Sequence, residues 1–124
     1  MSDAQEGPRV LIVDDNLALA ENIAEILSME GYRTEVVGSG EEALPKVADD
    51  LTILLTDFRL PGLNGAELIA EVRRRREDLR FFVMSAHTDE QTVSRARAAG
   101  ARFLAKPLDM RTLARLVAGR EASA

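Results

Sequence analysis

Residues 51–65 have the sequence LTILLTDFRLPGLNG, and this stretch holds a complete connection from a strand to a helix. Its first part, Leu51–Leu55, is almost entirely apolar, which favours a strand buried on both faces of a parallel sheet. Asp57 ends the run, and Asn64 stands three residues before Glu67, the spacing of a helix N-cap. An apolar stripe follows at helical spacing, formed by Leu68, Ile69 and Val72.

The same unit recurs along the chain. Four more short aliphatic or β-branched runs predict strands, at Arg9–Val13, Thr34–Val37, Phe81–Met84 and Phe103–Ala105. Stretches with helical periodicity separate them, such as the stripe of Leu19, Ile23, Ile26 and Leu27. Alternating elements of these lengths predict an α/β fold, (βα)5, with a doubly wound parallel five-stranded sheet and helices on both faces. We expect this domain over residues 9–119, with tails at 1–8 and 120–124.

Helix ends are marked by capping residues. Capping-box spacing occurs at Ser39 with Glu42 and at Thr88 with Gln91, and left-handed C-caps are expected at Gly31 and Gly100. The last helix is expected to start at Asp109 and to fade near Gly119.

Pro45 interrupts the second predicted helix. A proline inside a helix removes a backbone hydrogen bond and crowds an earlier carbonyl. That helix is therefore expected to be kinked, short or partly irregular.

The composition argues against nucleic-acid-binding, disulfide-bonded and membrane-spanning proteins. The 124 residues include 21 acidic and 16 basic residues, and the formal charge of −5 disfavours nucleic acid as a main partner. There is no cysteine, which excludes disulfides and thiolate metal sites. The first residues, MSDAQEGPR, lack the apolar core of a signal peptide, and no apolar run approaches the roughly 20 residues of a membrane helix. These features predict a soluble cytoplasmic protein without membrane contact, and the basic run Arg73–Arg76 is expected to be a solvated helix end.

Polar residues stand at the carboxyl ends of four predicted strands. The first strand is followed by Asp14 and Asp15, the third by Asp57, the fourth by Ser85 and the fifth by Lys106. Ligands of such sheets bind at this edge, and each residue taken alone has a simpler explanation in turn or cap formation. Three clustered carboxylates need a cation to stay ionised, which favours Mg²⁺ and chemistry at a phosphoryl group.

These motifs resemble those of a known family. The pair Asp14-Asp15, TDFRLPGLNG around Asp57, MSA ending at Ala86 and FLAKP ending at Pro107 together resemble the receiver domain of two-component response regulators. The resemblance extends from about Arg9 to Val117. It implies a flavodoxin-like fold with the strand order 2-1-3-4-5.

The resemblance also implies a role for each matching residue. Asp57 is expected to be the phosphoacceptor. Mg²⁺ would be bound by Asp15 and Asp57 directly, by Asp14 largely through water and by the backbone carbonyl of Arg59. Lys106, next to a cis peptide to Pro107, would contact the phosphoryl oxygens. Ser85, where threonine is commoner, would be the switch hydroxyl, and Phe103 the switch aromatic, although residues 100–103 are one residue shorter than the family pattern.

The implied function is that of a phosphorylation-controlled switch rather than an enzyme, with slow self-dephosphorylation. A histidine kinase or histidine phosphotransfer protein would donate the phosphoryl group. A protein partner or a second copy would bind the face formed by the fourth helix, fifth strand and fifth helix. That face carries several charged residues, namely Arg95, Arg97, Arg111, Arg115, Asp89 and Glu90; they can equally serve only to solvate the helices.

Several alternatives and one hypothesis accompany this interpretation. A Mg²⁺-dependent aspartyl phosphatase would need a carboxylate two residues after Asp57, where Arg59 stands. A flavodoxin-type binding module would need a phosphate loop in place of Asp14-Asp15-Asn16. A degenerate receiver would act only as a docking module. The hypothesis is that Arg59 and His87 tune the lifetime of the phosphorylated form, and the alternative is that they are inert loop residues.

Overall fold

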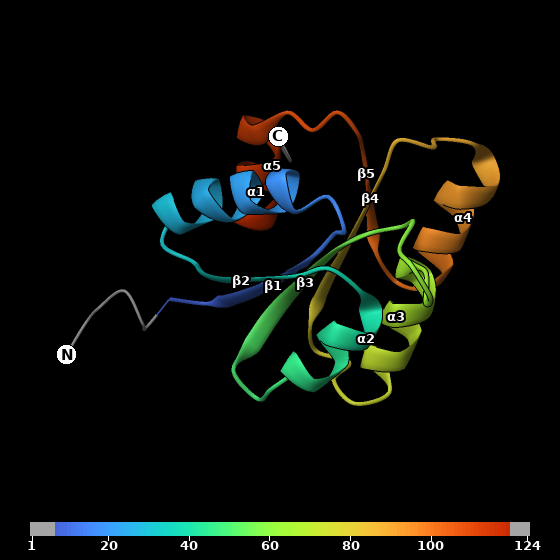
Figure 1. Cartoon of the computed structure of the whole chain (residues 1–124), viewed down its shortest axis with the longest axis horizontal. Helices are drawn as coiled ribbons and strands as arrows, with labels where there is room; N and C mark the ends of the chain where they lie inside the picture. Colours follow the sequence, from blue (N-terminus) through green and yellow to red (C-terminus); the bar gives the residue numbers. More distant parts are fainter. Residues whose placement is uncertain (1–6, 120–124) are drawn as a thin grey trace.

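The computed structural model describes residues 7–119, which fold as alternating strands and helices (Figure 1). The elements are β1 (Arg9–Val13), α1 (Leu17–Met29), β2 (Arg33–Val37), α2 (Gly40–Ala43), a 3₁₀ segment (Leu44–Lys46), β3 (Leu51–Asp57), α3 (Gly65–Arg73), β4 (Arg80–Ser85), α4 (Glu90–Ala98), β5 (Arg102–Ala105) and α5 (Met110–Val117). All five predicted strands are confirmed, with ends extended by two residues or fewer. The predicted tail at 120–124 and residues 1–6 lie outside the described part.

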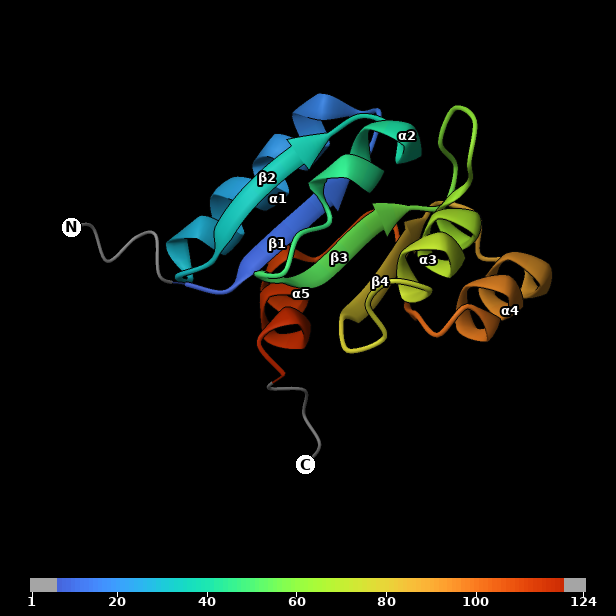
Figure 2. The ribbon, with the colours of Figure 1, turned by 90° about the horizontal axis from the view of Figure 1, so that it is seen from below.

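The five strands are parallel and lie in the order β2-β1-β3-β4-β5, as the resemblance implied (Figure 2). The register aligns their carboxyl ends. Val13 lies beside Thr56, Asp57 beside Met84, and Ser85 beside Ala105. Because of this register, the polar residues that end the strands meet at one edge of the sheet.

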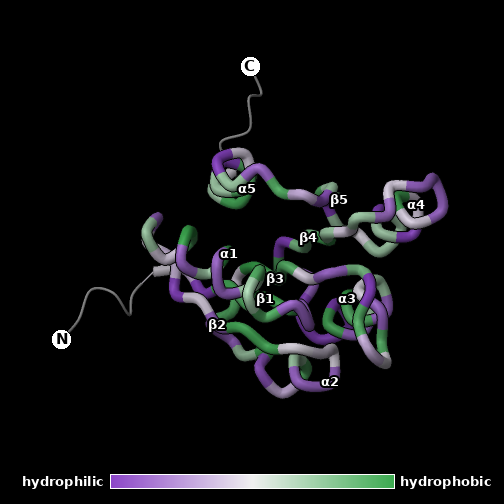
Figure 3. The backbone as a smooth tube through the Cα atoms, turned by 45° about the horizontal axis from the view of Figure 1, so that its top comes forward, coloured by the Kyte–Doolittle hydropathy of each residue, from purple (hydrophilic) through white to green (hydrophobic). Residues whose placement is uncertain are grey.

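Helices cover both faces of the sheet. Figure 1 shows α1 and α5 on one face and α2, α3 and α4 on the other. One core, which includes Ile23, Leu27 and Leu113, lies under α1 and α5; the other, which includes Leu68 and Val72, lies under α2 and α3. Much of β1 and β3 is hydrophobic (Figure 3), and these strands lack polar alternation because helices bury both of their faces.

The caps agree with the sequence at most helix ends. Asn64 and Glu67 form a complete capping box, and Gly31 and Gly100 have positive φ angles of 99° and 94° after α1 and α4. At α2, Ser39 accepts from Glu42 N, but the Glu42 side chain accepts from Gly38 N rather than from the cap residue. The second helix is short and turns into a 3₁₀ segment at Pro45, as predicted.

One sequence expectation is wrong, and another is confirmed only in part. The N-cap of α4 is Asp89 and not Thr88, because the Asp89 carboxylate accepts from both the backbone N–H and the hydroxyl of Thr92. The basic run at the end of α3 is exposed at Arg73, Arg74 and Arg75, as expected, but arginines of the run also bind backbone carbonyls. Arg73 donates to Ala99 O at 2.9 Å, and Arg76 donates to Ala48 O at 2.7 Å. These two side chains therefore tie neighbouring loops and helices together.

Within residues 7–119, none of the helices is long and apolar enough to cross a membrane.

Candidate functional site

Backbone hydrogen bonds fix the residues that carry the acidic side chains. Asp14 N donates to Val37 O at 3.1 Å, which extends the contact of β1 with β2 by one residue. Phe58 N donates to Met84 O at 2.8 Å and anchors the chain just after Asp57 to β4. Asp57 is thus the last residue of β3, and Asp14 and Asp15 directly follow β1.

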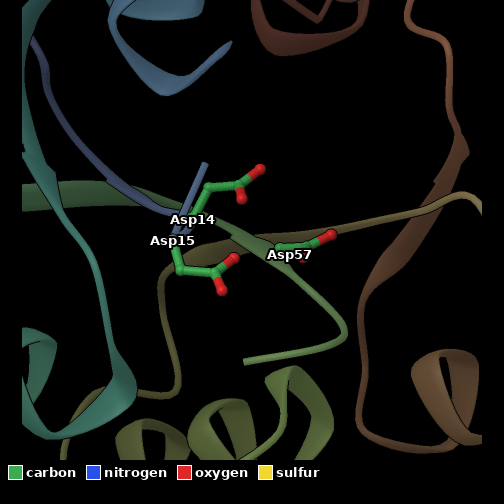
Figure 4. A group of neighbouring side chains, drawn as sticks. All are labelled: Asp14, Asp15 and Asp57. Atoms are coloured by element: carbon green, nitrogen blue, oxygen red, sulfur yellow. The ribbon is translucent and has the colours of Figure 1, made fainter. Parts of the chain in front are cut away.

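The three carboxylates form one cluster. An oxygen atom of each of Asp14, Asp15 and Asp57 lies within 4.8 Å of the others. Figure 4 shows the three side chains side by side, with Asp14 and Asp15 at the end of β1 and Asp57 at the end of β3. Asp14 is fully buried and Asp57 is 8% exposed, while Asp15 is open to solvent.

Lys106 joins two of these carboxylates. Its Nζ lies 3.0 Å from Asp14 Oδ2 and 3.0 Å from Asp57 Oδ1. The Lys106 backbone N–H donates to Ser85 O at 2.9 Å, and the peptide bond to Pro107 is cis, as predicted. The end of β5 therefore carries the one ammonium group that faces the cluster among the described residues.

The site is electrostatically unbalanced. Burial raises the pKa of Asp57, a hydrogen bond from Lys106 lowers it, and the charge of Asp14 raises it again, so that the net shift is upward. Burial lowers the pKa of Lys106, but its hydrogen bonds to Asp14 and Asp57 outweigh burial and raise it overall. One lysine thus faces three carboxylates, two of which are shielded from water.

This donor set fits a hard divalent cation. It offers carboxylate oxygens, with no histidine or cysteine in the cluster, and Mg²⁺ prefers oxygen ligands and keeps several waters. Both oxygens of Asp14 already have partners, since Oδ1 accepts from Asn16 N at 2.9 Å and Oδ2 faces Lys106. Asp15 and Asp57 are therefore the carboxylates better placed to contact a metal directly.

The remaining predicted residues surround the cluster at different depths. Ser85 is buried, and its Oγ accepts from His87 N at 2.9 Å. Phe103 is half-buried and packs against the core on the α3 side of the sheet. The side chains of Arg59 and His87 are exposed. Of the predicted residues, Asp14 and Asp57 are thus joined directly by Lys106, while these four lie around that group.

Arg95 also lies at this site, although the sequence did not predict it there. The guanidinium carbon of Arg95, on α4, lies 5.5 Å from the centroid of the Phe58 ring, next to the cluster. Both residues line a cavity of about 550 Å³ that also reaches Asp15; its lining is Asp15, Phe58, Arg59, Leu60, Pro61, Asn64 and Arg95. The sequence carries no signal for this contact, because the two residues are far apart in the chain and belong to different elements.

Comparisons with known proteins agree with this geometry. The model of the response regulator receiver domain family matches residues 10–118. A response regulator receiver protein of Anaeromyxobacter sp. (strain Fw109-5) is 41% identical over 93 residues, which cover 74% of this chain and 39% of that protein. The response regulator FleR of Pseudomonas aeruginosa is 33% identical over 112 residues, which cover 89% of this chain and 24% of that protein. The chain thus spans less than half the length of these relatives.

Solved structures show the same fold. A CheY-like receiver domain protein of Methanospirillum hungatei JF-1 superposes with a TM-score of 0.86 and 27% identity, over 92% of this chain and 93% of that one. The chemotaxis protein CheY4 of Vibrio cholerae gives a TM-score of 0.84 and 25% identity, over 91% of this chain and 98% of that one. Family match, sequence relatives and fold agree with the acidic site at the strand ends, and the chain belongs to the receiver domain family of two-component response regulators.

Proposed function

We propose that residues 9–119 form a receiver unit in which Asp57 accepts a phosphoryl group in a Mg²⁺-dependent reaction. The observation that carries this proposal is the contact of Lys106 with Asp57 inside a cluster of three carboxylates. The phosphoryl group would come from the phosphohistidine of a histidine kinase or a histidine phosphotransfer protein.

The residues of the site have separate tasks in this transfer. An oxygen of the Asp57 carboxylate attacks phosphorus, the bond between phosphorus and the leaving group breaks, and its electron pair departs with the leaving group. Lys106 Nζ, 3.0 Å from Asp57 Oδ1, is placed to hold an oxygen of the transferred group. Mg²⁺, held by Asp15, Asp57 and the backbone carbonyl of Arg59, with Asp14 acting through water, would neutralise charge on the phosphoryl oxygens.

Ser85 and Phe103 are proposed to transmit the effect of phosphorylation at Asp57 to the partner-binding face. The Ser85 hydroxyl accepts from His87 N, so its own hydrogen can be donated to a phosphoryl oxygen. Movement of Ser85 would release space toward half-buried Phe103 on the adjacent strand β5. A partner protein or a second copy would then bind the face of α4, β5 and α5, where Arg97, Arg111 and Arg115 are exposed.

The alternatives account for fewer observations. A phosphatase would need an acid or base where Arg59 stands, and a flavin or nucleotide site would place ligand phosphate against Asp14 and Asp15. If the domain acted only as a docking module, the contact of Lys106 with Asp57 would have no role in its function. We keep the hypothesis that Arg59 and His87 set the lifetime of the phosphorylated form, which dephosphorylation of Arg59→Ala and His87→Ala would test.

The test of the proposed function is intact mass after incubation with acetyl phosphate or phosphoramidate, with and without Mg²⁺. We expect a single phosphoryl adduct in the parent chain that requires Mg²⁺ and is absent in Asp57→Asn. Asp50→Asn, a change of an exposed aspartate at the other end of the sheet, is the matched control and should retain the adduct. An adduct that persists in Asp57→Asn, or none in the parent chain, contradicts the proposal.

A further inference from the structure

A cavity adjoins the acidic cluster on the side of α4. It measures about 550 Å³ and lies between the loop after β3 and α4. Asp15 forms its wall toward the cluster, and apolar atoms of Phe58, Leu60 and Pro61 form another part of the lining. Arg59 and Arg95 supply the two positive charges.

These two arginines differ from most of the others in this chain. Arg9, Arg33, Arg74 and Arg76 form ion pairs with carboxylates, and Arg73 and Arg80 donate to backbone carbonyls. Within residues 7–119, neither Arg59 nor Arg95 forms an ion pair or a side-chain hydrogen bond. Neither guanidinium in the cavity is thus directly paired with a carboxylate of the described chain, although Asp15 lines the same cavity.

Arg95 is exposed, but it has one contact with an aromatic ring. Its guanidinium lies 5.5 Å from the centroid of the Phe58 ring, and Phe58 is only 7% exposed. A cation–π contact orients the guanidinium and leaves its N–H groups free to bind an anion. Phe58 directly follows Asp57, so this contact places the Arg95 guanidinium near the residue that we propose as phosphoacceptor.

We propose that this cavity is a subsite for the anionic leaving group of an acyl phosphate, and that Arg59 and Arg95 are specificity-determining residues for that donor. The inference rests on the proposed function of Asp57. When Asp57 attacks an acyl phosphate, a bond forms between its carboxylate oxygen and phosphorus. The bond from phosphorus to the acyl oxygen breaks, and the electron pair leaves on a carboxylate that needs no proton.

The charges explain why such a subsite helps. An acyl phosphate is an anion that has to approach Asp14, Asp15 and Asp57, and its leaving group develops a full negative charge during transfer. Guanidinium groups bind carboxylates through charge-assisted hydrogen bonds. Phosphoramidate, in contrast, releases neutral ammonia, which gains nothing from two arginines.

This difference between the two phosphoryl donors gives the test. The rate of adduct formation at Asp57 is measured by intact mass against the concentration of acetyl phosphate and, separately, of phosphoramidate, at constant Mg²⁺ and ionic strength. The variants are Arg95→Gln, Arg59→Gln and the double variant. Arg74→Gln is the matched control, since Arg74 is exposed at the C-terminal end of α3, outside the proposed partner face, and lines a different hollow with Ala70 and Glu77.

We expect Arg95→Gln to lower the rate constant for acetyl phosphate by about 3- to 10-fold, the scale of one charge-assisted contact at a partly exposed site. The rate with phosphoramidate should stay within about twofold, which also shows that the variant is folded and that Asp57 still reacts. Arg59→Gln should act in the same direction, and the double variant should lose the most.

Other outcomes overturn the inference. If Arg95→Gln reacts with acetyl phosphate like the parent chain, or if it slows both donors equally, the cavity does not bind the leaving group. An equal effect of Arg74→Gln would mean that net charge alone is responsible. Absence of an adduct with either donor in the parent chain would instead remove the proposed function, and the subsite with it.

Discussion

Asp57 is buried beside two other carboxylates, where its negative charge is unfavourable for folding. It is 8% exposed, and Asp14 and Asp15 lie beside it. Burial and the charge of Asp14 raise its pKa against the opposing hydrogen bond from Lys106. A carboxyl group whose pKa is raised on folding disfavours the folded state once it is ionised.

This conflict predicts that Asp57→Asn stabilises the domain in the absence of divalent metal. We expect the free energy of unfolding at neutral pH to rise by roughly 1 kcal/mol, because the variant removes a buried negative charge and keeps the shape of the side chain. Urea denaturation of both proteins in the presence of a chelator measures the difference.

The same pKa shift fixes the pH dependence of this gain. Between the unfolded-state pKa of Asp57 and its raised folded-state pKa, the parent chain loses stability as pH rises, and the loss is complete above the folded-state pKa. The advantage of Asp57→Asn should therefore shrink at acidic pH. Asp49→Asn, at an exposed position, is the control and should change little; a parent chain more stable than Asp57→Asn at neutral pH would contradict the prediction.

The sequence predicted the members of the acidic site better than its surroundings. Asp14, Asp57 and Lys106 follow strands, and the ends of parallel strands meet at one edge, so their proximity follows from the order of elements. The contact of Arg95 with Phe58 depends instead on how α4 packs beside the loop after β3. No periodicity or spacing in the chain reports that packing.

At the scale of elements, the start of α3 sets the position of the Asp57 backbone. Gly65 N donates to Phe58 O at 2.8 Å, and a Cβ at Gly65 would lie 2.5 Å from Asp57 O and 3.0 Å from Phe58 Cα. The helix can approach the end of β3 this closely only with glycine at its first position.

Gly65→Ala is therefore expected to destabilise the domain by about 1–3 kcal/mol, the usual effect of overpacking against atoms that cannot move aside. It should also slow adduct formation at Asp57, because the backbone of Asp57 has to shift. Gly38→Ala is the matched control, since the nearest atoms to its Cβ lie at 3.8 Å. Thermal unfolding and intact mass measure the two effects, and equal stability of both variants would contradict the expected clash.

The cap of α4 gives a second test at this scale. The Asp89 carboxylate accepts from the backbone N–H and the hydroxyl of Thr92, and these two hydrogen bonds lower its pKa. Asp89→Ala should lower the midpoint of thermal unfolding by about 3–6 °C, the scale of one lost N-cap in a small domain. Thr88→Ala, at the cap position expected from the sequence, should have a much smaller effect.

The pH dependence of that cap follows from the lowered pKa. Its contribution is present above the unfolded-state pKa of Asp89 and is lost as pH falls through the lower folded-state pKa. The difference between the parent chain and Asp89→Ala should thus vanish in strong acid. A larger effect of Thr88→Ala than of Asp89→Ala at neutral pH would restore the original expectation.

Helix boundaries were less predictable than the helices themselves because neighbouring residues compete for the same role. Thr88 and Asp89 can both cap a helix, and the carboxylate of Asp89 reaches two donors of Thr92 at once. The short second helix could be predicted from Pro45 alone, because the proline ring restricts the backbone whatever residues pack around it. The cap of α2 was predicted in part. Ser39 caps the helix as expected, but the Glu42 side chain accepts from Gly38 N instead of from Ser39 N.

At the scale of the whole molecule, apolar runs and helical periodicity predicted a parallel sheet covered on both faces, and the two cores confirm it. They did not predict which strands are neighbours, since all five runs are similarly apolar. The order β2-β1-β3-β4-β5 was implied by the resemblance to receiver domains. That order matters for function, because it places β1 beside β3 and so brings Asp14 and Asp15 next to Asp57.

A cation bound between these strand ends should stabilise the entire fold. If Mg²⁺ binds the folded chain and not the unfolded one, the free energy of unfolding rises by about 2.7 kcal/mol at a concentration one hundred times the dissociation constant. Urea denaturation over a series of MgCl₂ concentrations should show this rise in the parent chain. KCl at equal ionic strength controls for screening of surface charges.

Asp15→Asn separates specific binding from general charge effects. Asp15 is exposed, so the substitution should leave the metal-free fold intact while it removes one carboxylate of the cluster. The variant should therefore need far more Mg²⁺ for the same stabilisation. Equal stabilisation of the parent chain and Asp15→Asn would mean that the three carboxylates do not act together on one ion, and Lys106 alone would then have to balance Asp14 and Asp57.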